Sequence, residues 1–201
     1  MRSTTLTIIR DEHRALAAML QSMSMLLQQC RSHHQLPDFG LLRSMLFYID
    51  EYPNRLHHPK EDQLLFPLVR KYCPELADVL DELTADHEKG ERSIHLLEHT
   101  LLAYEVMGDA RREAFEQALA RYTAFYLRHM MLEERHVLRA AETQLGEEHW
   151  AELDAAFAAN QDPFAGGHPP DEAFQAVYQR ILKALPDPLG FAPPLQEGHQ
   201  V

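Results

Sequence analysis

The sequence predicts an all-α protein folded as an up-down-up-down four-helix bundle, and three observations lead to this prediction. Apolar residues recur every three or four positions over long stretches, as they do on the buried face of a helix. Alternating runs of Val, Ile and Thr, which are typical of strands, are missing, and glycine is sparse, with 8 among 201 residues. Four long periodic segments are joined by short polar loops, which favours antiparallel packing of neighbouring helices.

The size of the chain suits one domain, because 201 residues with 45% hydrophobic content can bury a sizeable core. We expect the bundle to occupy residues 1–146 and a C-terminal extension to occupy residues 147–201. Helical patterns over Glu147 to Asn160 and Asp171 to Leu185 predict one or two short helices in this extension. A Pro-rich tail follows from Pro186 to Val201.

Charge and composition limit the partners and the location. A formal net charge of −12 argues against nucleic acid and against an anionic membrane as partners. No apolar run approaches the roughly 18 residues of a membrane span, and Met1 to Ile9 lacks the pattern of a signal peptide. Cys30 and Cys73 fall near opposite poles of the predicted bundle and cannot pair, which fits a reducing compartment. We therefore expect a cytoplasmic protein, and nothing in the sequence indicates its oligomeric state.

The first predicted helix runs from a cap at Ser3 or Thr4 to about Ser32. Its apolar seam steps alternately by three and four residues through Leu6, Ile9, His13, Leu16, Leu20, Met23 and Leu27. His13 therefore lies in the core seam rather than on the wet face. A histidine in that position is either a hydrogen-bonded core residue or a metal ligand, and the first helix alone does not decide between them.

The second predicted helix begins at Asp38 and is interrupted by prolines. Each proline lacks a backbone N–H, so we expect a kink or a break between Tyr52 and Pro59. His57 and Glu61 are four residues apart and share one helical face. The pair suits a metal ion, and it is equally consistent with an ion pair at the surface.

The third predicted helix runs from Pro74 to Gly108, and its seam contains His87 and Gly90. A glycine within a helix costs roughly 1 kcal/mol relative to alanine, which indicates that Gly90 leaves room for another group. Glu91 borders the same seam, and it either reaches inward or pairs with a neighbouring cation at the surface.

The fourth predicted helix runs from Asp109 to Gly146, and His129 and Glu133 lie on its seam four residues apart. Glu134 lies about 100° further round the helix than Glu133. The pattern therefore favours Glu133 as the inward carboxylate.

The polar seam residues of the four helices are predicted to lie at one level of the bundle. His13 and His87 follow the starts of their helices by about ten and thirteen residues, and Glu61 and Glu133 precede the ends of theirs by about ten and twelve. Each residue is therefore roughly 15–20 Å from the same pole. Unpaired carboxylates buried together would cost several kcal/mol, and a bound cation removes that cost. Several imidazoles with two carboxylates able to bridge fit a pair of ions better than one tetrahedral zinc.

Other metal and cofactor motifs fit the chain less well. The ferritin-like di-metal bundle needs Glu-x-x-His on two helices, and residues 133–136 supply a single copy. The zinc-peptidase motif His-Glu-x-x-His and the covalent haem motif Cys-x-x-Cys-His are both absent from the sequence. A b-type haem bundle remains open, since the chain contains 8 methionines.

Over about residues 4–145, the chain resembles the hemerythrin-like, or HHE cation-binding, proteins. The resemblance rests on four motifs in order along the helices: Asp11-Glu12-His13-Arg14, His57-His58-Pro59-Lys60-Glu61, Asp86-His87-Glu88 and His129-Met130-Met131-Leu132-Glu133-Glu134. It implies a non-haem di-iron centre, with two iron ions, inside the bundle. It further implies that the terminal ligands are His13, His57, His87 and His129 and that the bridging carboxylates are Glu61 and Glu133.

The chain departs from the oxygen carriers of this family at two positions. The carriers have a second histidine one turn after the third-helix ligand, where this chain has Glu91. A ligating Glu91 would add negative charge, stabilise ferric iron and disfavour reversible oxygen transport. The last carboxylate of the carriers comes five residues after its histidine, which would select Glu134, whereas HHE relatives often use the fourth position, which selects Glu133. His58 either replaces the missing imidazole or lies exposed on its helix.

The resemblance implies a protein that binds O₂, NO or iron itself in a sensing, storage or stress role. An alternative from another class is an iron-dependent oxidase or a protein that repairs iron centres, so the sequence leaves open whether the protein is an enzyme. Tyr122 and Tyr126 lie on the seam within two turns of His129, and they either relay electrons or pack the core. Residues 146–201 receive no functional assignment.

Overall fold

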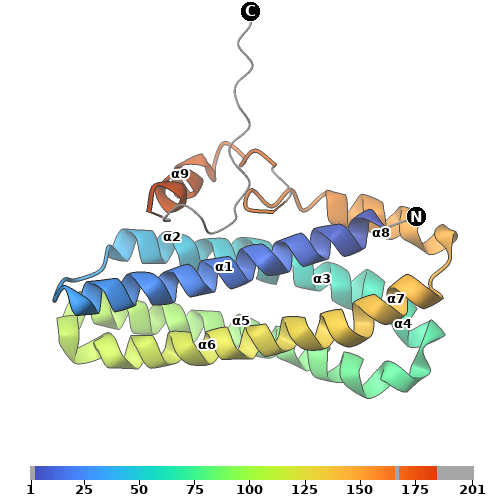
Figure 1. The fold of residues 1–201 in the computed structure, drawn as a ribbon, viewed down its shortest axis with the longest axis horizontal. Helices are drawn as coiled ribbons and strands as arrows, with labels where there is room; N and C mark the ends of the chain where they lie inside the picture. Colours follow the sequence, from blue (N-terminus) through green and yellow to red (C-terminus); the bar gives the residue numbers. More distant parts are fainter. Residues whose placement is uncertain (1–2, 166–167, 185–201) are drawn as a thin grey trace, which may run out of the picture.

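Four helical rods lie side by side along the long axis of the molecule (Figure 1). The computed structural model describes residues 3–165 and 168–184, and no strand occurs among them. The first rod is α1 (Thr4–Ser32), and the third is α5 (Ala77–Met107), which follows the 3₁₀ turn η3 (Pro74–Leu76). Successive rods run in opposite directions, so the predicted all-α, up-down-up-down bundle is confirmed.

The second rod consists of several helical pieces rather than one α-helix. It contains α2 (Phe39–Ile49), the π-helical turn η1 (Asp50–His57), α3 (His58–Lys60), the π-helical turn η2 (Glu61–Leu65) and α4 (Phe66–Tyr72). Pro53 lies inside η1. Because proline has no N–H to donate, widened turns allow the rod to continue past it. The interruption expected between Tyr52 and Pro59 thus takes the form of π-helical turns.

The fourth rod is interrupted in the same way. It follows the 3₁₀ turn η4 (Gly108–Arg111) and contains α6 (Arg112–Leu132), the π-helical turn η5 (Glu133–Leu138) and α7 (Arg139–Gln144). π-Helical turns are rare in proteins overall, but those that occur are often found at functional sites. In the described chain, η1 ends at His57, η2 begins at Glu61 and η5 begins at Glu133, so each of these turns adjoins a candidate ligand.

Two further helices cover one side of the bundle (Figure 1). α8 (Glu147–Ala158) packs along α1, and α9 (Gln175–Ala184) packs against α2. α9 begins later than expected, after a turn in which the Asp171 carboxylate accepts a hydrogen bond from the backbone N of Phe174 at 2.7 Å. The Pro-rich tail expected from Pro186 to Val201 lies outside the described residues.

α8 also fixes the beginning of α1. The Asp154 carboxylate accepts hydrogen bonds from Oγ of Ser3 at 2.9 Å, from N of Thr5 at 2.8 Å and from Oγ1 of Thr5 at 2.6 Å. The side chain of Ser3 therefore does not cap α1 as expected. A carboxylate from a distant part of the chain satisfies donors that the first turn of a helix leaves free.

Two apolar clusters fill the bundle, one towards each end. The first includes Met19, Leu42, Tyr104 and Phe115, and the second includes Ile9, Leu65, Leu80 and Val137. Cys30 and Cys73 are both free, as expected. Among the described residues, none of the helices combines the length and the apolarity that a membrane crossing requires.

Candidate metal centre

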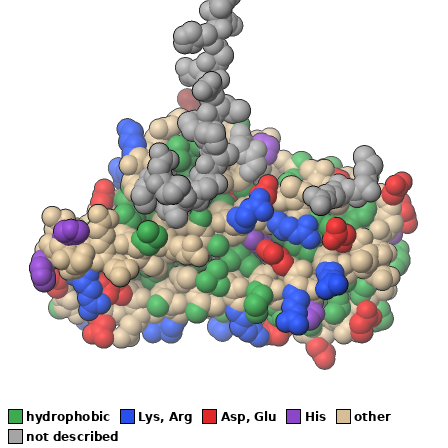
Figure 2. Space-filling view, viewed as in Figure 1, with side chains coloured by type: hydrophobic (Ala, Val, Ile, Leu, Met, Phe, Trp, Pro, Cys, Tyr) green, Lys and Arg blue, Asp and Glu red, His purple; other side chains and the backbone are tan. Residues whose placement is uncertain are grey.

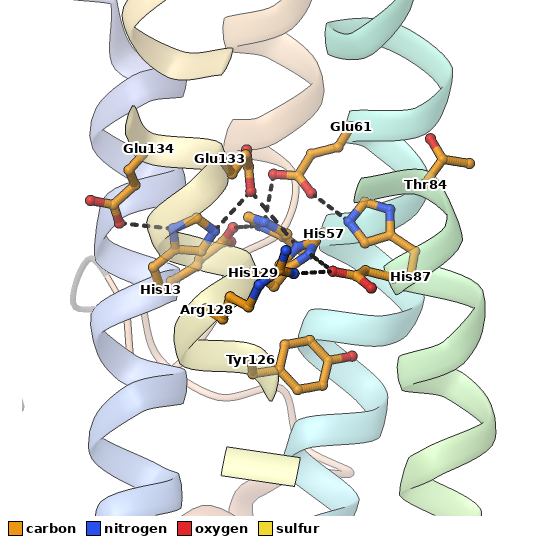
Figure 3. A network of polar contacts seen from close by, with 12 residues as sticks. His13, His57, Glu61, Thr84, His87, Tyr126, Arg128, His129, Glu133 and Glu134 are labelled. Atoms are coloured by element: carbon orange, nitrogen blue, oxygen red, sulfur yellow. Dashed lines mark hydrogen bonds and ion pairs between the residues drawn. The ribbon is translucent and has the colours of Figure 1, made fainter. Parts of the chain in front are cut away.

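The four seam histidines converge on one buried layer between the two apolar clusters (Figure 3). The first, second, third and fourth rods contribute His13, His57, His87 and His129 respectively, and all four side chains are buried. Glu61 and Glu133 reach into the same layer, and both are 0% exposed. The structure thus brings together the six residues to which the resemblance assigns ligand roles.

The Glu61 carboxylate lies between imidazoles from two rods. Its Oε1 atom is 2.8 Å from Nε2 of His57, and its Oε2 atom is 3.3 Å from Nε2 of His87. Both oxygens and both ring nitrogens are buried, and none of these four atoms has a partner in hydrogen-bond geometry. Buried polar atoms are normally paired, so four unpaired atoms that can each ligate a metal, facing one another, indicate a cation site.

Glu133 takes the corresponding position between the other two histidines. Its Oε2 atom is 3.3 Å from Nε2 of His13 and 4.0 Å from Nε2 of His129, and neither of its oxygens has a hydrogen-bond partner. Burial, together with the negative charge of Glu61, raises the pKa of Glu133 to about 7. A cation between the two carboxylates would offset their repulsion.

The carboxylates also govern the protonation of the rings. Burial alone would lower the pKa of His13 and His87, but the adjoining carboxylates raise both values to about 9. Against the effect of burial, Glu61 and Glu12 raise the pKa of His57 well above its usual range. A metal ion would compete with protons for these ring nitrogens, so metal binding would release protons.

Two groups of four buried side chains could each hold a metal ion. One group is His13, His57, Glu61 and Glu133, and the other is His58, Glu61, His87 and His129. Within each group the ligand atoms lie within 4.8 Å of one another. Because Glu61 belongs to both groups, two neighbouring ions could share its carboxylate.

His58 joins the layer, although the sequence allowed it an exposed position as well. The side chain is 5% exposed, so the exposed alternative is wrong. Its ring stacks on that of His87 with 4.2 Å between centroids and lies 5.8 Å from the ring of His129. Burial lowers the pKa of His58 well below its usual range, which leaves the ring in the neutral form that binds metals.

Glu91 does not reach this layer. It is exposed on α5, whereas the preceding residue, Gly90, faces the interior. A Cβ atom on Gly90 would collide with the hydroxyl of Tyr126, so the tyrosine ring occupies the space that the missing side chain leaves. The expectation of an inward Glu91, and of the ferric bias that depends on it, is therefore corrected. The side chain of Glu91, which lies about 100° round the helix from Gly90, faces solvent.

Glu134 lies behind His13 rather than among the ligand atoms. Its side chain is 43% exposed, and Nδ1 of His13 donates a hydrogen bond to its Oε1 atom at 2.9 Å. Glu133, which is fully buried, is the carboxylate of this neighbouring pair that faces the layer.

Glu134 is one of four acidic residues that approach the outer nitrogen of a seam histidine. In the other three cases, Nδ1 of His57 is 2.6 Å from Glu12, Nδ1 of His87 is 3.0 Å from Asp62, and Nδ1 of His129 is 3.8 Å from Asp86. Each acid belongs to one rod and approaches the histidine of the next rod, and the fourth rod returns to the first. These four links, which we call the outer carboxylate ring, keep the Nε2 atoms pointing inward.

Glu12, Asp62 and Asp86 were not predicted as site residues. A signal for them exists, because each is the immediate neighbour of a seam histidine or seam glutamate. On a helix, neighbours differ in direction by about 100°, which turns these acids toward the adjacent rod rather than into the seam.

A small cavity adjoins the imidazoles. Its volume is about 10 Å³, close to the smallest that holds one water-sized molecule. His58, His129 and Tyr52 are among the residues that line it. Only a small ligand could occupy this space without movement of the surrounding side chains.

A wider groove of about 530 Å³ opens between α1 and α6. Exposed Leu127 and Met131 line it, and Figure 2 shows hydrophobic side chains between charged ones on this face of the molecule. His13 and Met130 line both the groove and the small cavity. These two side chains therefore separate the buried layer from solvent on this face.

The fold and the buried layer together define a four-helix bundle whose histidine and glutamate side chains fit metal ions. The chain belongs to the hemerythrin HHE cation-binding domain family, whose model matches residues 4–141. Searches of curated proteins and of solved structures gave no match. The family match includes every candidate ligand and ends before α8, so the helices that cover the bundle lie outside it.

Proposed function

We propose that the protein binds two non-haem iron ions in the buried layer. It would use them to bind O₂ or NO, or to hold iron, in a sensing, storage or stress role. The observation that carries this proposal is the pair of four-residue groups that share Glu61. Imidazoles and carboxylates, without thiolates, are donors that suit iron, whereas one four-coordinate zinc ion would leave several of them unpaired.

The proposal gives each residue a role. His13 and His57 would hold one ion, His58, His87 and His129 would hold the other, and Glu61 and Glu133 would serve both. His58 thereby replaces the histidine that the oxygen carriers have one turn after their third-helix ligand. Glu134 belongs to the outer carboxylate ring, which orients the ligands and raises their basicity. Bound iron would supply one-electron chemistry and a binding position for a small ligand.

The size of the cavity supports a diatomic ligand. A space of about 10 Å³ beside His58 and His129 excludes larger organic substrates. Glu12 and Asp162 also line this space, but apolar atoms of side chains such as Tyr52 and Leu16 make up most of its wall. Such a wall favours an uncharged ligand such as O₂ or NO over an ionic one.

Elemental analysis and absorption spectroscopy of the purified protein test the proposal. We expect about two iron ions per chain, with near-ultraviolet bands of a di-iron centre that change on reduction and on exposure to air. Loading the metal-free protein separately with Fe(II), Mn(II) and Zn(II) is the control for metal identity. One zinc ion per chain would contradict the proposal, and a Soret band would indicate a b-type haem bundle instead.

An iron-dependent redox enzyme, including one that repairs iron centres, is the second candidate. The observation that favours it is a pair of buried tyrosines beside the layer. The ring of Tyr126 lies 5.9 Å from that of His129 and 4.8 Å from that of Tyr122, which offers a short path for an electron. Continuous O₂ consumption with a reductant, weakened in Tyr126→Phe, would favour the enzyme. A single stoichiometric uptake of O₂ or NO would favour the binding protein.

A further inference from the structure

One polar side chain of the C-terminal cover, which we define as α8, residues 159–165 and α9, is hydrogen-bonded toward the buried layer. Asn160 follows α8, is 4% exposed and lies outside the family match. Its Nδ2 atom donates to the Glu12 carboxylate, at 2.9 Å from Oε1 and 3.1 Å from Oε2. Nδ1 of His57 donates to the same carboxylate, with 2.6 Å between Nδ1 and Oε2. A continuous line of hydrogen bonds thus joins Asn160 to a candidate iron ligand.

Lys60 fixes the direction of this line. Its Nζ atom donates to Oδ1 of Asn160. Because a lysine ammonium only donates, the amide oxygen of Asn160 faces Lys60 and the amide nitrogen faces Glu12. Neither leucine nor aspartate at position 160 could donate to Glu12, and aspartate would also place a second negative charge against it.

The segment that carries Asn160 is anchored on both sides. Before Asn160, the ring of Phe157 packs edge-on against that of His57, with 6.1 Å between centroids. After Asn160, the buried Asp162 carboxylate accepts a hydrogen bond from the hydroxyl of Tyr48 at 2.8 Å. A side chain held between two such contacts has little freedom to move, as a group that orients a metal ligand requires.

We propose that Asn160 is a positioning residue, which the C-terminal cover adds to a metal centre otherwise built from the four rods. Asn160 holds the Glu12 carboxylate, Glu12 holds Nδ1 of His57, and Nε2 of His57 is thereby kept toward Glu61. The consequence for metal binding rests on the proposed iron function, whereas the hydrogen-bonded line itself does not. A residue that only stabilised α8 would leave His57 unaffected.

Proton NMR of the metal-free protein tests the line without reference to iron. The Nδ1 proton of His57, which is buried in a 2.6 Å hydrogen bond to a carboxylate, should give a far-downfield and slowly exchanging resonance. In Asn160→Leu we expect this resonance to move upfield and to exchange faster. Asp154→Asn is the matched control, because it weakens the contact between α8 and α1 without touching Glu12. It should keep the wild-type resonance.

Iron release is the second measurement. We expect a chromogenic chelator to remove iron about 10-fold faster from Asn160→Leu than from the wild type, and at the wild-type rate from Asp154→Asn. If Asn160→Leu does not fold, Asn160→Asp provides the same test at nearly constant shape.

A folded Asn160 variant with the wild-type His57 resonance would overturn the proposal. So would an altered resonance with unchanged iron release. If the wild type binds no iron but the resonance responds to Asn160, the positioning of His57 is supported and the proposed iron function is contradicted.

Discussion

The two faces of the buried layer hold their outer carboxylates in different surroundings. On the face under α8, the side chain of Glu12 is 7% exposed, accepts from His57 and is covered by Asn160. On the face between α1 and α6, Glu134 is 43% exposed, accepts from His13 and borders the open groove. The same bond, from an imidazole Nδ1 to a carboxylate, is therefore made once in the interior and once at the surface.

This difference in exposure predicts a difference in energy. An exposed carboxylate can exchange its protein partner for water, so its ion pair contributes only about 0–1 kcal/mol. A buried carboxylate has no such alternative, and removal of its partner leaves a charge uncompensated. We therefore expect the covered face to fix the geometry of the layer and the groove face to be where a small ligand reaches it.

The largest effect is expected from substitution of Glu61, which belongs to both four-residue ligand groups. Glu61→Ala removes that common ligand, so we expect iron to fall to a small fraction of the wild-type content, while the two apolar clusters keep the bundle helical. Elemental analysis measures the iron, and far-ultraviolet circular dichroism monitors the helices. His33→Ala, at an exposed position after α1, is the control and should retain wild-type iron. Near-normal iron in Glu61→Ala would dismiss the assignment of the layer.

The next effect is expected at Asp162, because its burial on the covered face makes ionisation of its carboxyl group unfavourable. Asp162 is buried, and burial, with the charge of Glu12, raises its pKa from 3.8 to about 7. Between these two pH values the folded protein holds a proton that the unfolded chain releases. Stability therefore falls as the pH rises through this interval, and the cost stays in full above about pH 7.

Asp162→Asn removes this charge at nearly constant shape. We expect the free energy of unfolding of the metal-free variant, relative to the wild type, to grow by on the order of 2 kcal/mol between about pH 5 and pH 8. Urea denaturation at several pH values measures it. In the control Asp154→Asn, the difference should stay constant, because hydrogen bonds from Thr5 lower the pKa of Asp154 against the effect of burial. A constant difference for Asp162→Asn as well would mean that its carboxyl is ionised throughout this range.

The bundle and most of the inward ligands could be predicted because both follow the period of an α-helix. His13, His87 and His129 occupy seam positions, and the structure buries all three at one level. His58 could not be placed in this way. Neighbouring residues on an α-helix point about 100° apart, and π-helical turns on both sides of α3 alter that relation, so that His57 and His58 both face inward.

Two acidic residues show what a single helix cannot reveal. Glu12 is buried because Asn160 and its neighbours cover that side of α1, and the pattern of α1 contains no information about this cover. Glu91 borders a seam in the same way, but the structure leaves it exposed. Contacts between segments far apart in the chain, rather than helical periodicity, decide which of these residues belongs to the site.

Matched substitutions of the two outer carboxylates compare the faces directly. Glu12→Gln and Glu134→Gln each keep the shape of the side chain and remove its charge. We expect iron affinity, measured by competition with a chelator, to fall about 10-fold for Glu12→Gln and less than about threefold for Glu134→Gln. Equal losses would mean that exposure does not set the strength of these bonds, and a larger loss for Glu134→Gln would reverse the comparison.

The smallest effect is expected where the groove meets the cavity. Met130 lines both spaces and is largely buried. A methionine side chain is flexible enough to move aside for a small molecule, whereas an indole in its place is rigid. Met130→Trp should therefore slow NO binding to the reduced, iron-loaded protein several-fold, and Met130→Ala should accelerate it. Stopped-flow absorption spectroscopy measures both rates.

One further variant and the iron content separate a change in access from damage to the proposed iron centre. Met107→Trp, at an exposed position near the end of α5, should bind NO at the wild-type rate. Iron content should stay unchanged in all three methionine variants, because none of them alters a candidate ligand. If both Met130 variants keep their iron and bind NO at the wild-type rate, the groove is not the route to the layer. Small ligands would then have to pass the covered face, and Asn160→Leu, which loosens that face, should be the variant that accelerates binding.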